Sequence, residues 1–148
     1  EQWLGARGAD LGEEQVAKVW KGLFYCFWHC DLRPAQAQLA RRLAALVGAL
    51  PRQAAGPYLT GFVRCLRREW GGIDHHRMDK FMLLVREFLR SAFSALAASQ
   101  WGLDDTAFFM AILHEGLVAE TQRGRASLGF GLHMTDVFVE ELERACAA

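Results

Sequence analysis

The sequence has no long uninterrupted hydrophobic run. Its most apolar stretch, residues 19–32, contains Lys21, His29 and Asp31 and is shorter than the roughly 20 residues that a membrane-spanning helix needs. We therefore predict that no segment of this chain spans a membrane. The chain also opens at Glu1 without a charged and then apolar leader, so we expect any targeting signal to lie outside this sequence.

Cysteine is scarce. Four cysteines in 148 residues, without any Cys-x-x-Cys pair, do not make a disulfide scaffold, so we expect reduced thiols. Cys26, His29 and Cys30 lie close together on an expected helix, but a structural zinc needs four ligands, and the only other candidate, His75-His76, sits at a helix start. We therefore predict no metal site and interpret the cysteines as small buried hydrophobic residues.

The short motifs of common enzyme classes are also missing. The sequence contains no GxSxG, HExxH, P-loop or GxGxxG pattern. We accordingly predict no catalytic residue, no cofactor and no small-molecule substrate.

There is no formal net charge, because 17 basic residues balance 17 acidic ones. Together with a hydrophobic content of 52%, this balance is typical of an ordinary globular chain and argues against disorder or an acidic tail.

Sustained alternation of apolar and polar residues is absent, whereas apolar residues recur every three or four positions almost throughout. This periodicity indicates an all-α fold, interrupted by only three prolines. We expect about six helices: over 13–30, from Pro34 to Leu50, from Gly56-Pro57 to Gly71-Gly72, from a cap at Asp74 to about Leu96, from a cap at Asp104 or Asp105 to about Leu117, and around 134–142 after a polar loop over 120–131.

Helices joined by short turns pack as antiparallel hairpins, either in a bundle or in a stacked, HEAT-like α-solenoid or helical array. We favour the array because the first and fourth helices carry apolar residues beyond one stripe, among them Tyr25, Trp28 and Leu83. Residues 1–148 are expected to form a single helical domain with an ordered core over about 13–146.

Basic residues gather in the middle of the chain. Arg64, Arg67 and Arg68 fall on one face of the third helix, Arg77, Lys80, Arg86 and Arg90 follow on the fourth, and the last helix is instead acidic. Three interpretations stay open: solvated faces with local ion pairs, contacts to nucleic-acid phosphates, and a protein partner. Trp70, beside a double glycine, is interpreted as a plug between helices rather than a residue that stacks on bases.

Three stretches carry a recognisable pattern: VWKGLFYCFWHCDL at 19–32, REWGGIDHHRMDKFMLLVREFLR at 68–90 and GLHMTDVFVEEL at 131–142. In the same order they resemble stretches typical of the nucleolar family named for ribosomal RNA processing protein one. The resemblance covers about 13–144, and its most specific parts are the WKGLFYC core and the REW-x-GID-x-x-R-x-DKF pattern.

The resemblance implies an all-α, non-enzymatic protein of the nucleus and nucleolus, needed in precursors of the large ribosomal subunit for maturation of pre-rRNA. Its implied partners are other large-subunit assembly factors, including a β-propeller protein and a Brix-domain protein, together with pre-rRNA. Many members carry a long basic tail after this domain, and we expect any such tail to lie outside the present sequence.

No catalytic residue is carried over from the family. As contacts to a partner or to rRNA we predict Lys21, Arg64, Arg67, Arg68, Arg77, Lys80, Arg86 and Arg90. As structural residues we predict Trp20, Phe24, Trp28, Trp70, Asp74, Asp79 and Phe81, with Asp74 as a helix cap and Asp79 in an ion pair with Lys80 or Arg77.

These inferences favour a non-enzymatic scaffold that holds proteins, and pre-rRNA with them, in a nucleolar particle. Two alternatives stay open. One is a stand-alone RNA-binding helical module, and the other is a general helical protein-interaction domain outside ribosome assembly.

Overall fold

The computed structural model describes residues 12–117 and 125–147. In these ranges the chain forms α-helices and one 3-10 turn, and no strand. The elements are α2 (Glu13–Trp28), α3 (Arg33–Ala49), α4 (Arg52–Glu69), η1 (Trp70–Gly72), α5 (His75–Ala98), α6 (Leu103–Leu117) and α7 (Arg125–Cys146). The predicted all-α fold of about six helices is confirmed.

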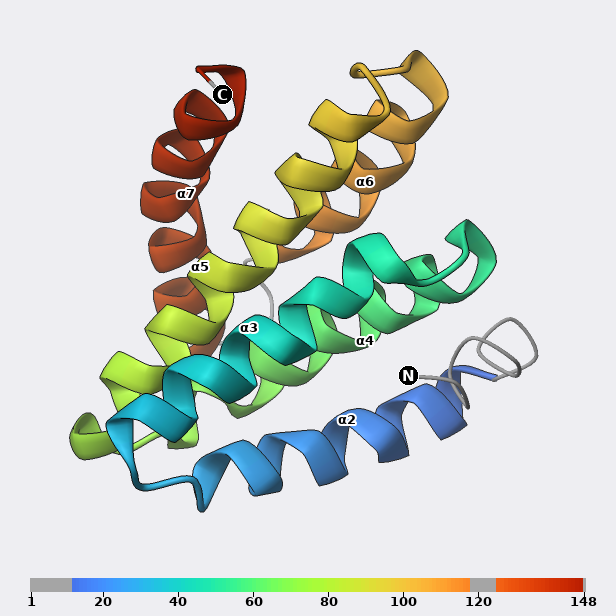
Figure 1. Ribbon diagram of the computed structural model, residues 1–148. Coiled ribbons are helices and arrows are strands. Elements are labelled where there is room, and N and C mark those ends of the chain that lie inside the picture. The colour runs from blue at the N-terminus through green and yellow to red at the C-terminus, as the bar shows by residue number, and fades with distance from the viewer. Residues whose placement is uncertain (1–11, 118–124, 148) are drawn as a thin grey trace.

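The helices stack in two layers, and the chain alternates between them (Figure 1). One layer holds α2, α4 and α6 in that order, and the other holds α3, α5 and α7. Each helix packs beside the helix that comes two places earlier in the chain, in the same layer. This is the stacking of a helical array, as predicted. A specific relation to HEAT hairpins stays a prediction.

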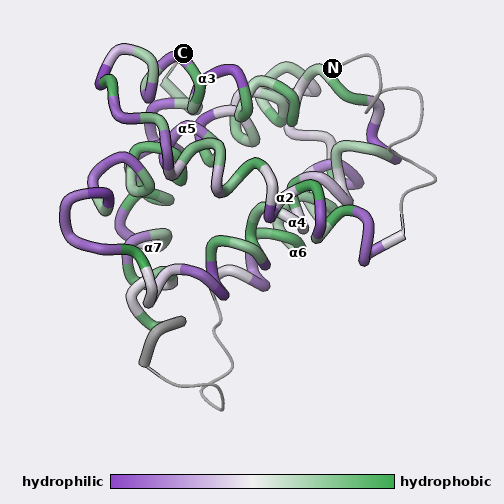
Figure 2. The backbone as a smooth tube through the Cα atoms, turned by 90° about the horizontal axis from the view of Figure 1, so that it is seen from below, coloured by the Kyte–Doolittle hydropathy of each residue, from purple (hydrophilic) through white to green (hydrophobic). Residues whose placement is uncertain are grey.

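Figure 2 shows hydrophobic and hydrophilic segments following one another along the helices, as expected of amphipathic helices. On α2, for example, Val16, Trp20, Phe24 and Phe27 are buried. Within the described ranges, none of the helices is both long and apolar enough to cross a bilayer.

Aromatic side chains from three helices form the centre of the core. Phe62 of α4 stacks on Phe88 of α5 with ring centroids 3.8 Å apart, and Trp20 of α2 packs edge-on against Phe88 at 5.5 Å. A second group joins Phe24 and Phe27 to Phe81 of α5, with centroids 4.9 and 5.2 Å apart. The aromatic stretch at 19–32 therefore forms much of the interface between α2 and the rest of the array.

The end of α2 is fixed by a residue far along the chain. The Lys80 ammonium donates to the carbonyl oxygens of Trp28 at 2.6 Å and Cys30 at 2.8 Å. A lysine at this point satisfies carbonyls that have no partner inside the helix and complements the negative end of the helix dipole. The helix ends at Trp28, two residues before the predicted end at Cys30, and Lys80 caps it there.

The start of α4 differs from the prediction. Pro57 lies inside this helix, which begins at Arg52 rather than at Gly56-Pro57. Proline at this position removes the hydrogen bond that residue 57 would donate to the Gln53 carbonyl, and its ring also crowds that carbonyl. The preceding turn is held because Ala54 and Ala55 are buried and their amides donate to the Pro51 carbonyl at 2.8 and 2.9 Å.

Other boundaries and faces need correction as well. The expected loop over 120–131 is helical from residue 125, and residues 118–124 lie outside the described part. Asp104 and Asp105 occupy the first turn of α6 rather than its cap, where their charge still favours the helix dipole. Tyr25 is 47% exposed, so this residue does not support the argument that α2 is covered on two sides.

Candidate interaction groove and charged surfaces

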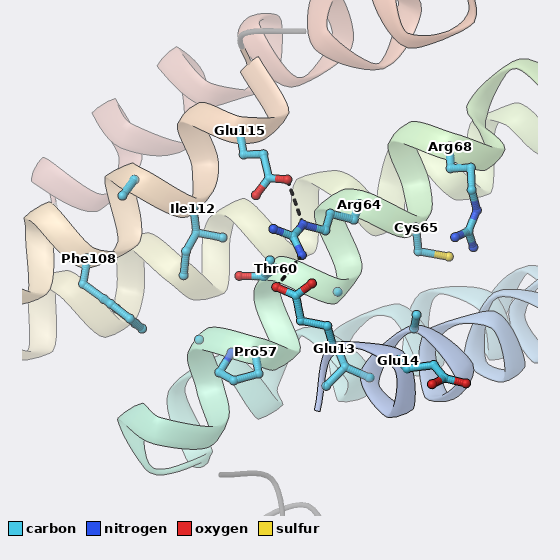
Figure 3. Close-up of a pocket in the computed structure, with 15 residues that line it drawn as sticks. Glu13, Glu14, Pro57, Thr60, Arg64, Cys65, Arg68, Phe108, Ile112 and Glu115 are labelled. Carbon is cyan, nitrogen blue, oxygen red and sulfur yellow. Dashed lines mark hydrogen bonds and ion pairs between the residues drawn. The ribbon is translucent and has the colours of Figure 1, made fainter. Parts of the chain in front are cut away.

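A groove of about 810 Å³ runs between α2 and α6, with α4 as its floor (Figure 3). The floor consists mostly of small side chains, and the walls carry both apolar and charged ones. Lining residues include Ala17 from α2, Gly56, Pro57, Thr60 and Gly61 from α4, and Phe108, Ala111 and Ile112 from α6.

Two glycines of α4 bring the walls of this groove close to its floor. A Cβ on Gly61 would collide with the Trp20 ring and Val16 of α2, and a Cβ on Gly56 would collide with the Phe108 ring of α6. Because only glycine permits both approaches, these positions set the separation of α2 and α6 from α4.

Arg64 lies at the centre of the groove between carboxylates of both walls (Figure 3). Its guanidinium lies 2.8 Å from the Glu115 carboxylate and 3.2 Å from that of Glu13. The hydrogen bond to Glu115 raises the pKa of Arg64. The predicted contact residue Arg64 is therefore already neutralised by α2 and α6.

The two ends of the groove differ in chemistry. At the apolar end, the Arg52 guanidinium lies 4.6 Å from the centre of the Phe108 ring and bonds Asp105 at 3.0 Å. At the other end, Arg68 bonds Glu69 at 2.8 Å, beside the buried Cys65 thiol. The arginines along the groove are thus each paired with a carboxylate, and they form no continuous basic surface.

The remaining predicted contacts on α4 and α5 also have partners inside the domain. Arg67 donates to the Glu115 carbonyl at 2.9 Å, and Arg77 bonds Asp74 at 2.6 Å. Lys80 is only 5% exposed, so the structure places it in the interior and not on a contact surface. Lys21, by contrast, is exposed and forms no ion pair with any residue of the described ranges.

Arg86 and Arg90 join α5 to α7 through a buried carboxylate. The Glu141 side chain is fully buried, and it accepts from Arg86 at 3.0 Å and from Arg90 at 2.9 Å. Burial alone would raise the pKa of this carboxyl, but the hydrogen bonds from Arg90 and Arg86 lower it below its ordinary value. These two arginines therefore contribute to packing between helices.

The motif at residues 68–90 contains a buried tryptophan that contacts α7 and an aspartate that caps α5. Trp70 is 6% exposed and packs against Phe130 and His133 of α7, with centroids 5.3 and 5.7 Å away. Asp74 accepts from the Arg77 amide at 3.1 Å and so caps α5.

The ion pair expected for Asp79 is wrong. Arg77 pairs with Asp74 instead, and Lys80 bonds carbonyls. Asp79 is exposed and has no ion pair with any residue that the structure describes.

The cysteines do not all behave as expected. Cys65 is buried, but Cys26 and Cys146 are exposed, which contradicts their interpretation as buried hydrophobic residues. Over residues 12–117 and 125–147 there is no group of three or more histidine, cysteine, aspartate or glutamate side chains placed to hold a metal ion.

The sequence interpretation did not identify the groove. Its signal was present in the two glycines five positions apart on α4, Gly56 and Gly61, but a glycine inside a helix does not reveal which side chain lies against it.

The sequence was compared with models of known protein families and with known proteins. The family model described as "Nucleolar protein, Nop52" matches residues 1–148. The chain is 33% identical over 149 aligned residues to the Ribosomal RNA processing protein 1 homolog of Drosophila melanogaster, covering 97% of this chain and 21% of the relative.

Two further relatives carry related names. Identity to Ribosomal RNA processing protein 1 homolog B of Homo sapiens is 36% over 136 residues, 90% of this chain and 18% of the relative. Identity to the Caenorhabditis elegans homolog is 28% over 146 residues, 97% of this chain and 36% of the relative. The chain thus spans about a fifth of the length of the fly and human relatives.

Proposed function

The chain belongs to the Nop52 family of nucleolar proteins, and on this premise we propose that its helical array is a non-enzymatic scaffold in precursors of the large ribosomal subunit, needed there for pre-rRNA processing. The family confirms the resemblance seen in the sequence motifs and the expected nucleolar localisation. The names of the relatives support a role in rRNA processing and ribosome biogenesis.

The observation that carries the scaffold role is the groove between α2 and α6. Its floor of small residues lets another backbone approach closely, and its apolar wall residues can be buried on binding. Because Arg64 is neutralised by Glu13 and Glu115, the groove offers little attraction to phosphates. We therefore assign it to a protein segment, such as an amphipathic helix of another assembly factor.

The alternative of a stand-alone RNA-binding module is less well supported. Such a module would use the arginine cluster on α4 and α5 to contact phosphates. Arg64, Arg86 and Arg90 each bond carboxylates of neighbouring helices instead. For Arg86 and Arg90, contact with RNA would first require breaking ion pairs with the buried Glu141 carboxylate that join α5 to α7.

A rescue experiment tests the proposal. The tagged protein replaces the endogenous one in cells, and co-purifying proteins, co-purifying RNA and unprocessed pre-rRNA are measured. Ala111→Trp places a large ring in the groove from an exposed position of α6, while Ala107→Trp, one turn earlier and outside the groove lining, is its matched control.

We expect the wild type and Ala107→Trp to recover large-subunit precursors and to restore processing. Ala111→Trp should lose at least one protein partner and leave pre-rRNA unprocessed. Purification of the wild type without large-subunit precursors would refute the scaffold proposal, and full activity of Ala111→Trp would refute the role of the groove.

A further inference from the structure

The outward face of α2 carries an unusual set of exposed residues. Lys18, Lys21, Gly22, Tyr25 and His29 are all exposed, and their spacing of i, i+3, i+4, i+7 and i+11 places them along one side of the helix. The opposite side holds Trp20, Phe24 and Phe27 in the core. We refer to these five exposed residues as the α2 outer face.

Tyr25 is the first feature that the fold does not explain. It is 47% exposed, and it is the single aromatic residue among the exposed large hydrophobic side chains of the described ranges. Its ring lies edge-on to Phe24 with centroids 5.5 Å apart, so the aromatic core supports its position. An exposed aromatic ring contributes little to folding but offers a surface on which another ring can stack.

Gly22 is the second such feature. Gly61 and Gly56 are required by close packing, but a Cβ on Gly22 would meet nothing within 4 Å. Glycine in the interior of a helix costs about 1 kcal/mol relative to alanine, and no intramolecular contact accounts for that cost here. A bare backbone beside an exposed ring allows close approach of a ligand.

This side of α2 has a net positive charge, because two lysines face one carboxylate, that of Glu14. Lys21 has no ion pair with any residue of the described ranges, and Lys18 bonds only Glu14, at 2.7 Å. Both members of that pair are largely exposed, 73% and 81%, so the bond is weak and easily exchanged. Lysine is disfavoured in the centres of protein interfaces but suits phosphate contacts, so these charges favour a nucleic acid over a protein.

We propose that the α2 outer face binds single-stranded RNA, with one base stacked on Tyr25 above Gly22 and the neighbouring phosphates contacted by Lys21 and Lys18. Single-stranded RNA fits because its bases are free to stack on aromatic rings, whereas bases inside a duplex are already stacked on one another. The inference deepens the proposed function and rests on it, since it names the RNA-contacting surface of the scaffold.

Fluorescence anisotropy with a labelled single-stranded oligouridine and the purified 148-residue chain tests this assignment. Tyr25→Ala should weaken binding by about tenfold, the usual effect of losing one stacked base. Lys21→Gln should weaken binding and lower the slope of log affinity against log salt by about 0.7, the value for one phosphate on a single strand. Thermal unfolding of Lys21→Gln should match the wild type because its side chain is exposed. Tyr25→Ala should stay folded at the assay temperature with a slightly lower melting temperature, because its half-exposed ring loses the edge contact with Phe24.

The matched control is the double variant Arg41→Gln/Arg42→Gln on α3. It removes two exposed charges that form no ion pair with any residue of the described part, which is more charge than Lys21→Gln removes. If affinity follows total charge, the control loses more than Lys21→Gln, and the assignment to the α2 outer face is overturned. Equal or tighter binding of a duplex of the same length overturns it as well.

The two proposals can fail separately. A wild-type chain that binds no single-stranded RNA but still purifies with large-subunit precursors overturns the RNA surface and leaves the scaffold intact. If Tyr25→Ala loses a protein partner while RNA affinity is unchanged, the face is a protein surface and the inference is wrong. RNA binding by a chain that purifies without large-subunit precursors refutes the scaffold instead.

Discussion

Gly61 of α4 lies directly against the indole ring of Trp20 on α2. The ring has no room to move, because Trp20 is 1% exposed and its Nε1 donates to the Tyr58 carbonyl at 2.7 Å. The hydrogen bond and the missing Cβ together fix how closely α2 approaches α4. This spacing also sets one wall of the groove.

Gly61→Ala should therefore lower the free energy of unfolding by about 1–3 kcal/mol, the usual cost of overpacking a core. The measurement is thermal or urea unfolding followed by circular dichroism. Gly48→Ala is the matched control, since its Cβ would lie 3.8 Å from the Ala95 Cβ, an ordinary contact. We expect the control to be neutral or up to about 1 kcal/mol more stable. An equal loss in both variants would show that the close approach of Trp20 is not responsible.

Lys80→Met should destabilise the domain by about 2 kcal/mol. Methionine retains an apolar stem of similar shape but leaves the carbonyls of Trp28 and Cys30 without their charged donor. Lys21→Met makes the same exchange at an exposed position and should stay within about 0.5 kcal/mol of the wild type. Equal melting temperatures for the two variants would contradict a capping role for Lys80.

Helical periodicity predicted much of the core correctly. Phe81, Val85, Phe88 and Leu89 recur along α5 at the three- and four-residue spacing that indicated a helix, and all are buried. A period near 3.6 residues fixes which side of a helix is apolar, and an apolar side must be covered in a folded domain. Met82 follows the same spacing but is 36% exposed, so the period alone does not mark the edge of the buried face.

The ion pairs could not be predicted in the same way. Arg86 and Arg90 bond Glu141, which lies 55 and 51 positions further along the chain. The sequence shows that one helix is basic and the other acidic, but the register between helices depends on side-chain packing along their whole contact. Local spacing therefore identified the charged helices without showing that they neutralise each other.

Which apolar residues of α2 are buried could be predicted only in part, for a related reason. Its apolar residues beyond one stripe, among them Tyr25 and Trp28, were interpreted as support for a helical array. Trp20, Phe24 and Phe27 are buried. Tyr25 belongs to the same aromatic stretch as these buried residues, yet it is 47% exposed. Composition cannot separate a ring that fills a core from one that is available to a ligand.

Glu141→Gln should destabilise the domain by about 2–3 kcal/mol, because two arginines lose their charged acceptor. Glu140→Gln is the matched control, since Glu140 also bonds Arg86 but its side chain is 60% exposed. An exposed pair of this kind contributes about 0.2–1 kcal/mol. Denaturant unfolding of the two neighbouring variants separates the buried carboxylate from the exposed one.

The same carboxylate should make stability depend on pH. The pKa of Glu141 in the folded state is below its ordinary value of 4.5, so the unfolded chain binds the proton more tightly. The stability from this group is therefore present above pH 4.5 and is lost as pH falls through the folded-state pKa. Glu141→Gln should reduce the acid-induced loss of melting temperature, whereas an unchanged acid profile would show that other carboxyls cause it.

Cys65 should resist alkylation in the folded protein while Cys26 and Cys146 react. Burial raises the pKa of the Cys65 thiol to about 11, so only about one thiol in a thousand is ionised at pH 8. The thiol also points to the Trp20 carbonyl, 3.8 Å away, under the contact between α2 and α4. Iodoacetamide labelling at pH 8 followed by mass spectrometry gives the rate at each cysteine.

Labelling of Cys65 then reports on the packing between α2 and α4. In denaturant all four cysteines should react at similar rates, which shows that protection comes from the fold. Because Gly61→Ala pushes α2 away from α4, the same variant should speed labelling of Cys65 without changing that of exposed Cys146. Rapid native labelling of Cys65 in the wild type would mean that α2 does not cover α4, and the wall of the groove would be lost with it.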